Sequence, residues 1–337
     1  MGHEPSAASV SRTTLKDIAR RLNVSESTVS VVLNGTRSGT RVSASTRQAV
    51  LEAAMELGYR PNAVAQSLVR GRTGVIGVFY GFPQVRSMFY LELVAAIQDA
   101  CALIGRDVLI HAGHSVHGGQ TVAQAYDGRV DGLILAAWPH AKDTAPFIEG
   151  GLPVVAIVEE HERIPSVTVD YELGGRLQAR HLFDRGHRKV LYRGPRDQEP
   201  SPYIRERSFR EEAALLGIEV VSGRRIGYRW EFELTHEETE LVKSRSVTAL
   251  ACWEDELAHG TAAAVADLGM RVPEDVAVIG FNGSPTYFTP RFDVTTVDAH
   301  WDQVARAGVE TLDRLLNGMP VAPRLLLPLS IRQGVTT

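Results

Sequence analysis

Residues 14–34, TLKDIARRLNVSESTVSVVLN, contain two short helical patterns that are separated by a tight turn. Thr14 and Asp17 fit the first turn of a helix, and Asn23 can take the left-handed conformation that ends it. The apolar residues between them have the spacing of a helix that buries one face. They are Leu15, Ile18, Ala19 and Leu22.

The second pattern begins at Ser25, whose hydroxyl can cap a helix. We expect an inward face of Val29, Val32 and Leu33 and an outward face of Glu26, Ser27, Ser30 and Val31. A short second helix with mostly small exposed side chains is typical of a helix-turn-helix, although an ordinary helical hairpin has the same spacing.

Further motifs follow this pair of helices. A third helix is expected from Ser43 to Gly58. Its core positions are Val50, Ala53, Ala54 and Leu57. With the stretches TLKDIA, VSESTVS, VLNG, RVSASTR, ELGYRPN and AQSL in this order, the chain resembles the LacI/GalR family of bacterial transcription regulators. The resemblance implies a repressor that binds operator DNA and is controlled by a small-molecule effector.

The composition is that of a soluble globular protein with more than one domain, since 337 residues are 44% hydrophobic and 23% charged. No apolar run is long enough to span a membrane, so we expect no membrane partner. Residues 1–11 lack a signal-peptide core and are expected to form a disordered leader. Cys101 and Cys252 have no CxxC partner, which favours buried thiols in the reduced cytoplasm, where the protein would be associated with the nucleoid.

The charge is unevenly distributed along the chain. Residues 12–72 hold ten Lys or Arg and four Asp or Glu, a balance of +6, whereas the net charge of the whole chain is −4. The remainder therefore carries −10. A basic N-terminal segment on an acidic body indicates a local surface for a polyanion such as nucleic acid.

From Gly74 onward, apolar runs alternate with helical stretches in two rounds, the second beginning after Asp170. This alternation predicts parallel sheets covered by helices on both faces. The expected fold class is α/β, with an all-α helix-turn-helix headpiece and a two-lobed core that resembles periplasmic binding proteins.

The predicted domains are the leader at 1–11, the headpiece at 12–58, a hinge helix and linker at 59–73, and an effector-binding and dimerisation core at 74–337. The tail is expected to cross between the lobes. The N-subdomain then comprises about 74–169 and 298–323, and the C-subdomain about 170–297 and 324–337.

Residues 61–68, PNAVAQSL, predict a short helix that begins at a proline. A helix of this length is not stable alone in water, so a partner or DNA must hold it. By resemblance to the family, this hinge helix orders on the operator, pairs with its twin and inserts Leu68 into the minor groove, with Ala65 as its close neighbour. The alternative is that Leu68 packs on the core domain.

Small polar groups near helix starts can donate hydrogen bonds to phosphate oxygens. We expect Glu26, Ser27 and Val31 to contact the edges of the bases. Many relatives carry Arg at the position of Val31. Valine offers only a methyl contact, as to thymine, so we expect a different operator half-site. The expected DNA-binding residues are Thr14, Leu15, Ser25, Glu26, Ser27, Thr28, Ser30, Val31, Asn34, Ser43, Thr46, Tyr59, Asn62, Ala65 and Leu68.

The resemblance also implies an effector site between the lobes. Arg205 and Trp230 match an arginine that contacts the effector and an aromatic residue that stacks on it. Glu254 and Asn282 stand where many relatives have Asn and Asp, which keeps polar groups but changes their donors and acceptors. The further candidates are Phe89, Trp138 and Glu159. Plain packing of the aromatic residues and an ion pair of Arg205 are the alternatives, and a polyol, sugar, nucleoside or other polar metabolite remains open as effector.

An enzyme is not indicated, because the chain has no GxSxG, Walker A or GxGxxG motif. His111, His114 and His117 lie among glycines, which favours exposed loop histidines over a metal site, and no cofactor is expected. A solute-binding protein without a DNA-reading role would account for the core but not for residues 12–72. We expect a homodimer, since a palindromic operator mirrors two-fold symmetry and no heptad helix for a tetramer follows the core.

Overall fold

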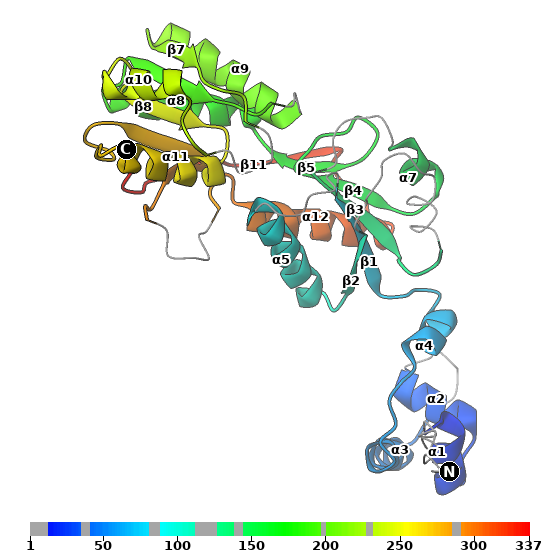
Figure 1. Cartoon of the computed structure of the whole chain (residues 1–337). Helices are drawn as coiled ribbons and strands as arrows, with labels where there is room; N and C mark the ends of the chain where they lie inside the picture. The colour runs from blue at the N-terminus through cyan, green and yellow to red at the C-terminus, as the bar shows by residue number, and fades with distance from the viewer. Residues whose placement is uncertain are drawn as a thin grey trace, which may run out of the picture. The chain divides into compact units, whose positions relative to one another are not determined.

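The computed structural model describes residues 13–34, 41–80, 88–111, 127–137, 144–196, 200–226, 232–284 and 291–337. The chain divides into two units, Met1–Gly74 and Val75–Thr337, each of which is considered by itself (Figure 1). The predicted leader at 1–11 lies outside the described residues.

The first unit consists of helices. They are α1 (Leu15–Leu22), α2 (Glu26–Asn34), α3 (Ala44–Glu56) and α4 (Ala63–Arg70). Ile18, Val29 and Val50, one from each of the first three helices, are fully buried in a common core. Asn23 takes a φ of 51° where α1 ends, as expected. The Ser25 hydroxyl accepts from the backbone N–H of Thr28 at 3.1 Å and so caps α2.

The hinge helix is present as α4 but begins two residues later than the sequence suggested. Asn62 provides the reason, since its side-chain Oδ1 accepts from the N–H of Ala65 at 3.4 Å and its carbonyl accepts from the N–H of Gln66 at 2.9 Å. Asn62 is therefore the N-cap, and Pro61 precedes the helix rather than opening it.

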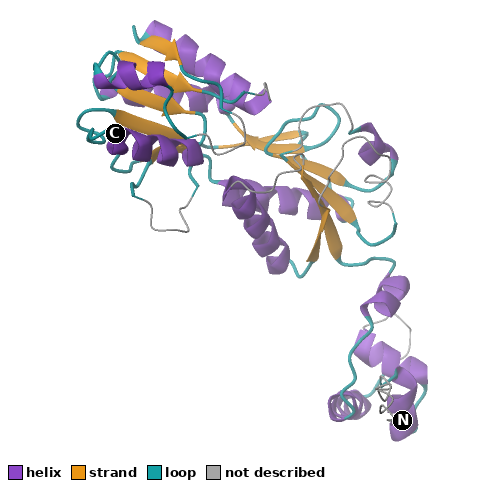
Figure 2. Cartoon of the chain, in the orientation of Figure 1, coloured by secondary structure: helices purple, strands orange, loops and turns teal. Residues whose placement is uncertain are grey.

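The second unit contains two six-stranded sheets (Figure 2). The first has the order β11-β5-β4-β3-β1-β2, and all its neighbouring strands are parallel. Its strands are β1 (Val75–Tyr80), β2 (Asp107–His111), β3 (Gly132–Ala136), β4 (Val154–Ile157), β5 (Ser166–Val169) and β11 (Arg324–Leu327).

The second sheet has the order β12-β10-β9-β8-β6-β7 and is parallel except for the edge strand β12. Its strands are β6 (Lys189–Arg193), β7 (Glu219–Ser222), β8 (Ala249–Cys252), β9 (Ala277–Asn282), β10 (Thr295–Asp298) and β12 (Ser330–Arg332). The predicted parallel sheets are confirmed.

Helices cover both faces of each sheet, and the strands alternate accordingly. Val78 belongs to the core under α5 (Met88–Leu103) and α12 (Trp301–Leu316), whereas Phe79 belongs to the core under α7 (Ala145–Glu149). In the second sheet, one core lies under α8 (Tyr171–Asp184) and α9 (Pro200–Leu215), and the other under α10 (His236–Lys243) and α11 (Asp255–Asp267). We call the two layered bodies the N-lobe and the C-lobe.

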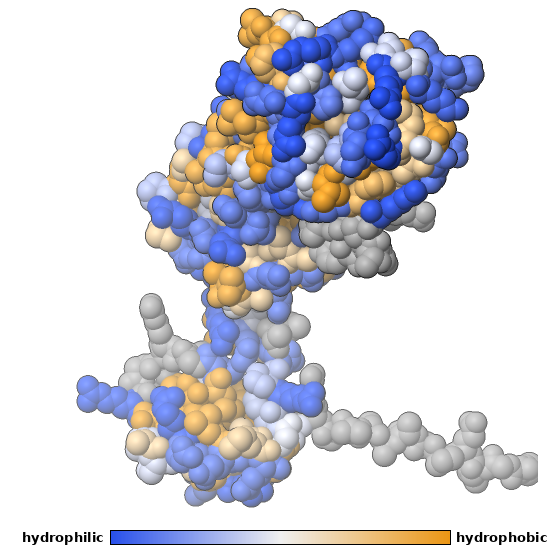
Figure 3. Space-filling model, turned by 90° about the vertical axis from the view of Figure 1, so that its left-hand side faces the viewer, coloured by the Kyte–Doolittle hydropathy of each residue, from blue (hydrophilic) through white to orange (hydrophobic). Residues whose placement is uncertain are grey.

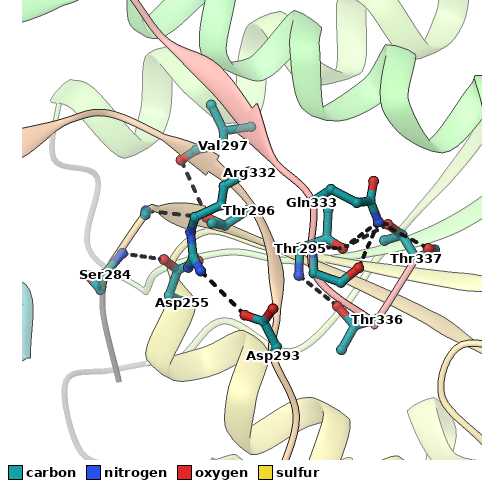
Figure 4. A network of polar contacts seen from close by, with 12 residues as sticks. Asp255, Ser284, Asp293, Thr295, Thr296, Val297, Arg332, Gln333, Thr336 and Thr337 are labelled. Atoms are coloured by element: carbon teal, nitrogen blue, oxygen red, sulfur yellow. Dashed lines mark hydrogen bonds and ion pairs between the residues drawn. The ribbon is translucent and has the colours of Figure 1, made fainter. Parts of the chain in front are cut away.

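The chain crosses between the lobes after β5, after β10 and after β11. Since β11 pairs in parallel with β5, residues 324–327 belong to the N-lobe sheet, four residues beyond the predicted subdomain boundary at 323. The last crossing then delivers β12, and the C-terminal residues are fixed in the C-lobe because Thr336 Oγ1 donates to the carbonyl of Val278 at 2.7 Å. Figure 4 shows Thr336 beside Thr295, whose N–H it accepts at 2.9 Å.

Both cysteines are buried free thiols, as expected. Within the described part of the chain, no helix is long and apolar enough to cross a bilayer.

Candidate functional site

Helix α2 presents the side chains that were expected to read bases. Glu26 and Ser27 are exposed, Val31 is half-buried, and Val29 on the opposite side is fully buried. The Ser27 hydroxyl is 2.7 Å from that of Ser25, within hydrogen-bonding distance. Apart from Glu26, these exposed side chains are short, which suits insertion of the helix into a major groove.

The N-termini of α2 and α3 are built in the same way from the sequences SEST (25–28) and SAST (43–46). In each, the first serine accepts a 3.1 Å hydrogen bond from the backbone of the threonine three residues later, and the two hydroxyls lie 2.8 Å apart. Two helix starts thus carry clustered hydroxyls and the positive end of the helix dipole, which is an arrangement suited to phosphate oxygens.

Asn34, an expected DNA contact, is engaged within the headpiece. Its Nδ2 donates to Ser30 Oγ at 3.1 Å, and its Oδ1 accepts from Gln66 Nε2 at 2.9 Å. The side chain therefore joins the end of α2 to α4. Sequence analysis missed Gln66, because no periodic signal links residues 32 positions apart.

The hinge helix exposes apolar side chains. Leu68 is 81% exposed and Val69 is 60% exposed. Figure 3 shows apolar side chains gathered on the drawn face of the first unit. The other expected DNA contacts in this unit are also at least partly accessible: Thr14, Leu15, Ser43, Thr46, Tyr59, Asn62 and Ala65.

The second unit contains a cavity between its lobes, at the carboxyl ends of strands in both sheets. Five of the seven predicted effector contacts line it: Phe89, Glu159, Arg205, Glu254 and Asn282. The other two, Trp138 and Trp230, lie outside the described residues. The free space is about 50 Å³, which holds a few water molecules, so a metabolite would have to displace the surrounding groups.

Arg205 is the central cation of this cavity. It is 5% exposed, its Nη1 donates to the carbonyl of Trp253 at 3.0 Å, and its guanidinium lies 4.0 Å from the centre of the Phe281 ring. These contacts fix the plane of the guanidinium without occupying all of its five donors.

Two carboxyl groups face Arg205 from opposite lobes. Burial raises the pKa of Glu159 in the N-lobe, and Ser201 Oγ donates to it at 2.5 Å. Burial, with repulsion from Glu256 and Asp255, raises the pKa of Glu254 in the C-lobe to about 8, against the opposing effect of Arg205. Glu254 is therefore largely protonated at neutral pH and can donate a hydrogen bond as well as accept one.

Asp255, the residue after Glu254, is also buried. It is 1% exposed, and its Oδ2 accepts from the N–H of Ser284 at 2.8 Å (Figure 4). Burial raises the pKa of Asp255 to about 7. A Cβ at Gly280 would lie 2.1 Å from Asp255 Oδ1, so only glycine leaves room for this carboxyl group.

The cavity also has aromatic walls that sequence analysis missed in part. Phe89 contacts Tyr90 and Trp301 with ring centres 5.1 Å apart in each pair. Tyr171 donates to the carbonyl of Val158 at 2.7 Å. The buried Trp301 Nε1 has no acceptor among the described residues, and a buried donor without a partner beside a cavity is suited to a polar ligand.

The histidine cluster is described only in part, since His114 and His117 lie outside the described residues. The interpretation of His111 as an exposed loop residue was wrong. It is 8% exposed, ends β2 and stacks on Phe79 with ring centres 4.3 Å apart. The described segments contain no group of three residues that could hold a metal ion.

Comparison with known proteins gives two family matches. Residues 14–62 match the bacterial regulatory proteins of the lacI family, and residues 179–337 match the periplasmic binding protein-like domain. The chain is 28% identical to catabolite control protein A of Priestia megaterium, over 90% of this chain and 92% of the relative. It is 29% identical to the HTH-type transcriptional repressor PurR of Escherichia coli O1:K1 / APEC, over 95% and 97%.

Among solved structures, the Lac repressor dimer bound to operator and the anti-inducer ONPF superposes with a TM-score of 0.80 at 26% identity, over 96% of this chain and 99% of that chain. These findings confirm the predicted family and the predicted fold class.

Proposed function

We propose that this chain, which joins a LacI-family helix-turn-helix DNA-binding domain to a periplasmic-binding-protein-like core, is a transcriptional repressor that binds a palindromic operator as a homodimer. The observation that carries the proposal is the exposed face of α2, flanked by two identically capped helix starts. One such helix reads only a half-site, so two copies related by a two-fold axis are needed for a palindrome.

In this proposal, Glu26, Ser27 and Val31 read bases, and the hydroxyl clusters at the starts of α2 and α3 bind phosphates. Leu68 is the minor-groove wedge, and its exposure leaves it available for that role. The protein acts in the cytoplasm, on the nucleoid.

The effector of the proposed repressor binds in the interlobe cavity, where both lobes contribute polar groups. Arg205 and the carboxyl groups of Glu159 and Glu254 suit a ligand with several hydroxyl groups, and the aromatic walls suit a ring. A sugar, polyol or nucleoside fits this chemistry. Because the chain crosses between the lobes in three places, a ligand that contacts both lobes can shift their relative position.

The relatives named above are transcription regulators, so we propose no catalytic activity for the cavity. The competing function is solute binding alone. It would leave the exposed recognition face and the basic headpiece without a role.

The deciding experiment is selection of bound sequences from a random DNA pool by the full-length protein at moderate salt. Enrichment of a palindrome supports a dimeric repressor, and release of that DNA by one class of metabolite identifies the effector. If no sequence is enriched, with or without candidate metabolites, the protein is a solute-binding protein and the proposal is wrong.

A further inference from the structure

A second cavity lies in the C-lobe and is rich in arginine. We call it the arginine pocket, and its volume is about 380 Å³, within the range of small-molecule sites. Its described lining residues are Pro195, Arg196, Tyr203, Glu206, Arg207, Arg210 and Arg225. None of them lines the interlobe cavity.

The pocket is built from one face of α9 and two loops. Tyr203, Glu206, Arg207 and Arg210 have the spacing i, i+3, i+4 and i+7, so they form one stripe along a helix of 16 residues. The loops follow β6 and β7, which are neighbouring parallel strands. The N–H of Arg196 donates to the carbonyl of Ile226 at 2.8 Å and joins these loops. The site thus lies at the carboxyl ends of parallel strands, where ligands of such sheets bind.

The charges of the described lining residues are unbalanced. Among them are four arginines and one carboxylate, that of Glu206, which is 8% exposed. Glu206 Oε1 accepts from Arg210 Nε at 2.9 Å and from Arg225 Nη2 at 2.9 Å. Arg207 is paired outside the pocket with Glu172 at 2.7 Å. Arg225 also donates to Glu206 Oε2 through Nη1, and Arg210 donates to Ser222 Oγ at 3.0 Å. Each guanidinium has five N–H donors, so both arginines keep donors beyond these bonds.

The position of Arg225 depends on a close approach to the backbone. A Cβ at Gly194 would lie 2.5 Å from Arg225 Nη1 and 2.9 Å from Glu206 Oε2. The φ of Gly194 is not in the left-handed region, so the backbone there does not require glycine. Gly194 instead leaves the space in which the arginine and glutamate meet. Glu206 in turn raises the pKa of Arg225, which stays charged.

We propose that the arginine pocket binds a small phosphorylated metabolite through its phosphomonoester group. Guanidinium groups bind phosphate oxygens in pairs with short, charge-assisted hydrogen bonds, and a dianion matches the excess positive charge. Tyr203, which is 53% exposed, offers a ring face to the rest of the ligand. Glu206 orients Arg210 and Arg225 and at the same time competes with the ligand for them.

The test is calorimetric titration of the full-length protein with inorganic phosphate and with glycerol 3-phosphate, in a phosphate-free buffer at constant ionic strength. We expect saturable binding of one phosphate group per chain that Arg225→Gln weakens about tenfold or more, the effect of losing charge-assisted hydrogen bonds. Glu206→Gln should strengthen binding, because it releases two guanidinium groups. The matched control is Arg163→Gln, which changes an exposed arginine of the N-lobe and should leave affinity unchanged.

Opposite effects of Arg225→Gln and Glu206→Gln support the pocket. If the ion pair between these residues were merely structural, neither substitution would increase the affinity of the protein for phosphate. Thermal unfolding of each variant checks that it is folded. If Glu206→Gln does not fold, the phosphate affinity of Arg225→Gln alone tests the proposal. Binding that is unaffected by Arg225→Gln belongs to another surface, such as the headpiece, and overturns the proposal. Binding of a DNA oligonucleotide in the pocket without binding of either small phosphate also overturns it.

Discussion

Replacement of Leu68 by Ala tests the hinge as a DNA wedge. Leu68 is 81% exposed in the free chain, so it contributes little to folding, and Ala is at least as good a helix former. The substitution removes three carbon atoms per protomer. At about 0.8 kcal/mol per buried carbon, full burial of the wedge predicts a loss of about 2.4 kcal/mol per protomer and about 4.8 kcal/mol per dimer.

Since about 1.4 kcal/mol corresponds to a tenfold change, operator affinity should fall roughly 50-fold if half of this energy is realised and roughly 3,000-fold if all of it is. The assay is fluorescence anisotropy with a DNA palindrome obtained by selection and with a scrambled duplex of the same length. Binding to the scrambled duplex should change little, because it depends on phosphate contacts. The melting temperature should be unchanged.

The matched control is Met55→Ala, which removes a 76% exposed apolar side chain from α3 in the same unit. It should leave both affinities unchanged. An equal loss on the palindrome and on the scrambled duplex would refute the wedge, and so would equal effects of Leu68→Ala and Met55→Ala.

Three further predictions concern other residues. Val31→Arg should shift the selected half-site toward guanine at one position, because Arg can bond O6 and N7 together; repeating the selection with the variant measures this. Arg205→Ala should abolish the response to effector and keep effector-free DNA binding, as measured by anisotropy with and without ligand. Glu254 has a pKa raised from 4.5 to about 8, so wild type should lose stability relative to Glu254→Gln as pH rises from about 4.5 to 8. Thermal unfolding across this range measures the difference, and a difference that does not depend on pH contradicts the assignment.

The sequence predicted the helices of the headpiece, because their apolar residues recur at helical spacing, and most elements of the core, because apolar runs alternate there with helical stretches. It missed β5, β7, β10 and β12, which have three or four residues each and include polar ones, whereas the equally short strands β4 and β8 are entirely apolar. Thr295 and Thr296 of β10 are fully buried although they are polar. Tertiary pairing with β9 and β12, rather than local hydrophobicity, makes this segment a strand.

The family resemblance and the residues at strand ends predicted the charged and polar part of the interlobe cavity and also Phe89, but not the other aromatic walls. Tyr171 and Trp301 each open a helix at a crossing between the lobes, and both line the cavity. From the sequence alone, both residues are interpreted as ordinary core residues, because no local motif indicates that the start of α8 or α12 lines a cavity. The two crossings bring them together, and only the topology reveals that.

The contacts that the hinge helix makes within the headpiece are too few to keep it helical. Gln66 Nε2 donates to Asn34 Oδ1 at 2.9 Å, a neutral bond worth about 1 kcal/mol net. Starting an isolated helix is unfavourable by roughly a factor of a thousand, or about 4 kcal/mol, and eight residues return little of it. Leu68 and Val69 add no burial, since both are mostly exposed. This bond and the 3.4 Å bond from Arg70 Nη2 to the carbonyl of Asn34 set the orientation of α4 on the headpiece but are too weak to keep it helical by themselves. In the proposed mechanism, further stabilisation comes from DNA or a second copy of the helix, and this dependence would allow an effector in the core to control DNA binding through the hinge.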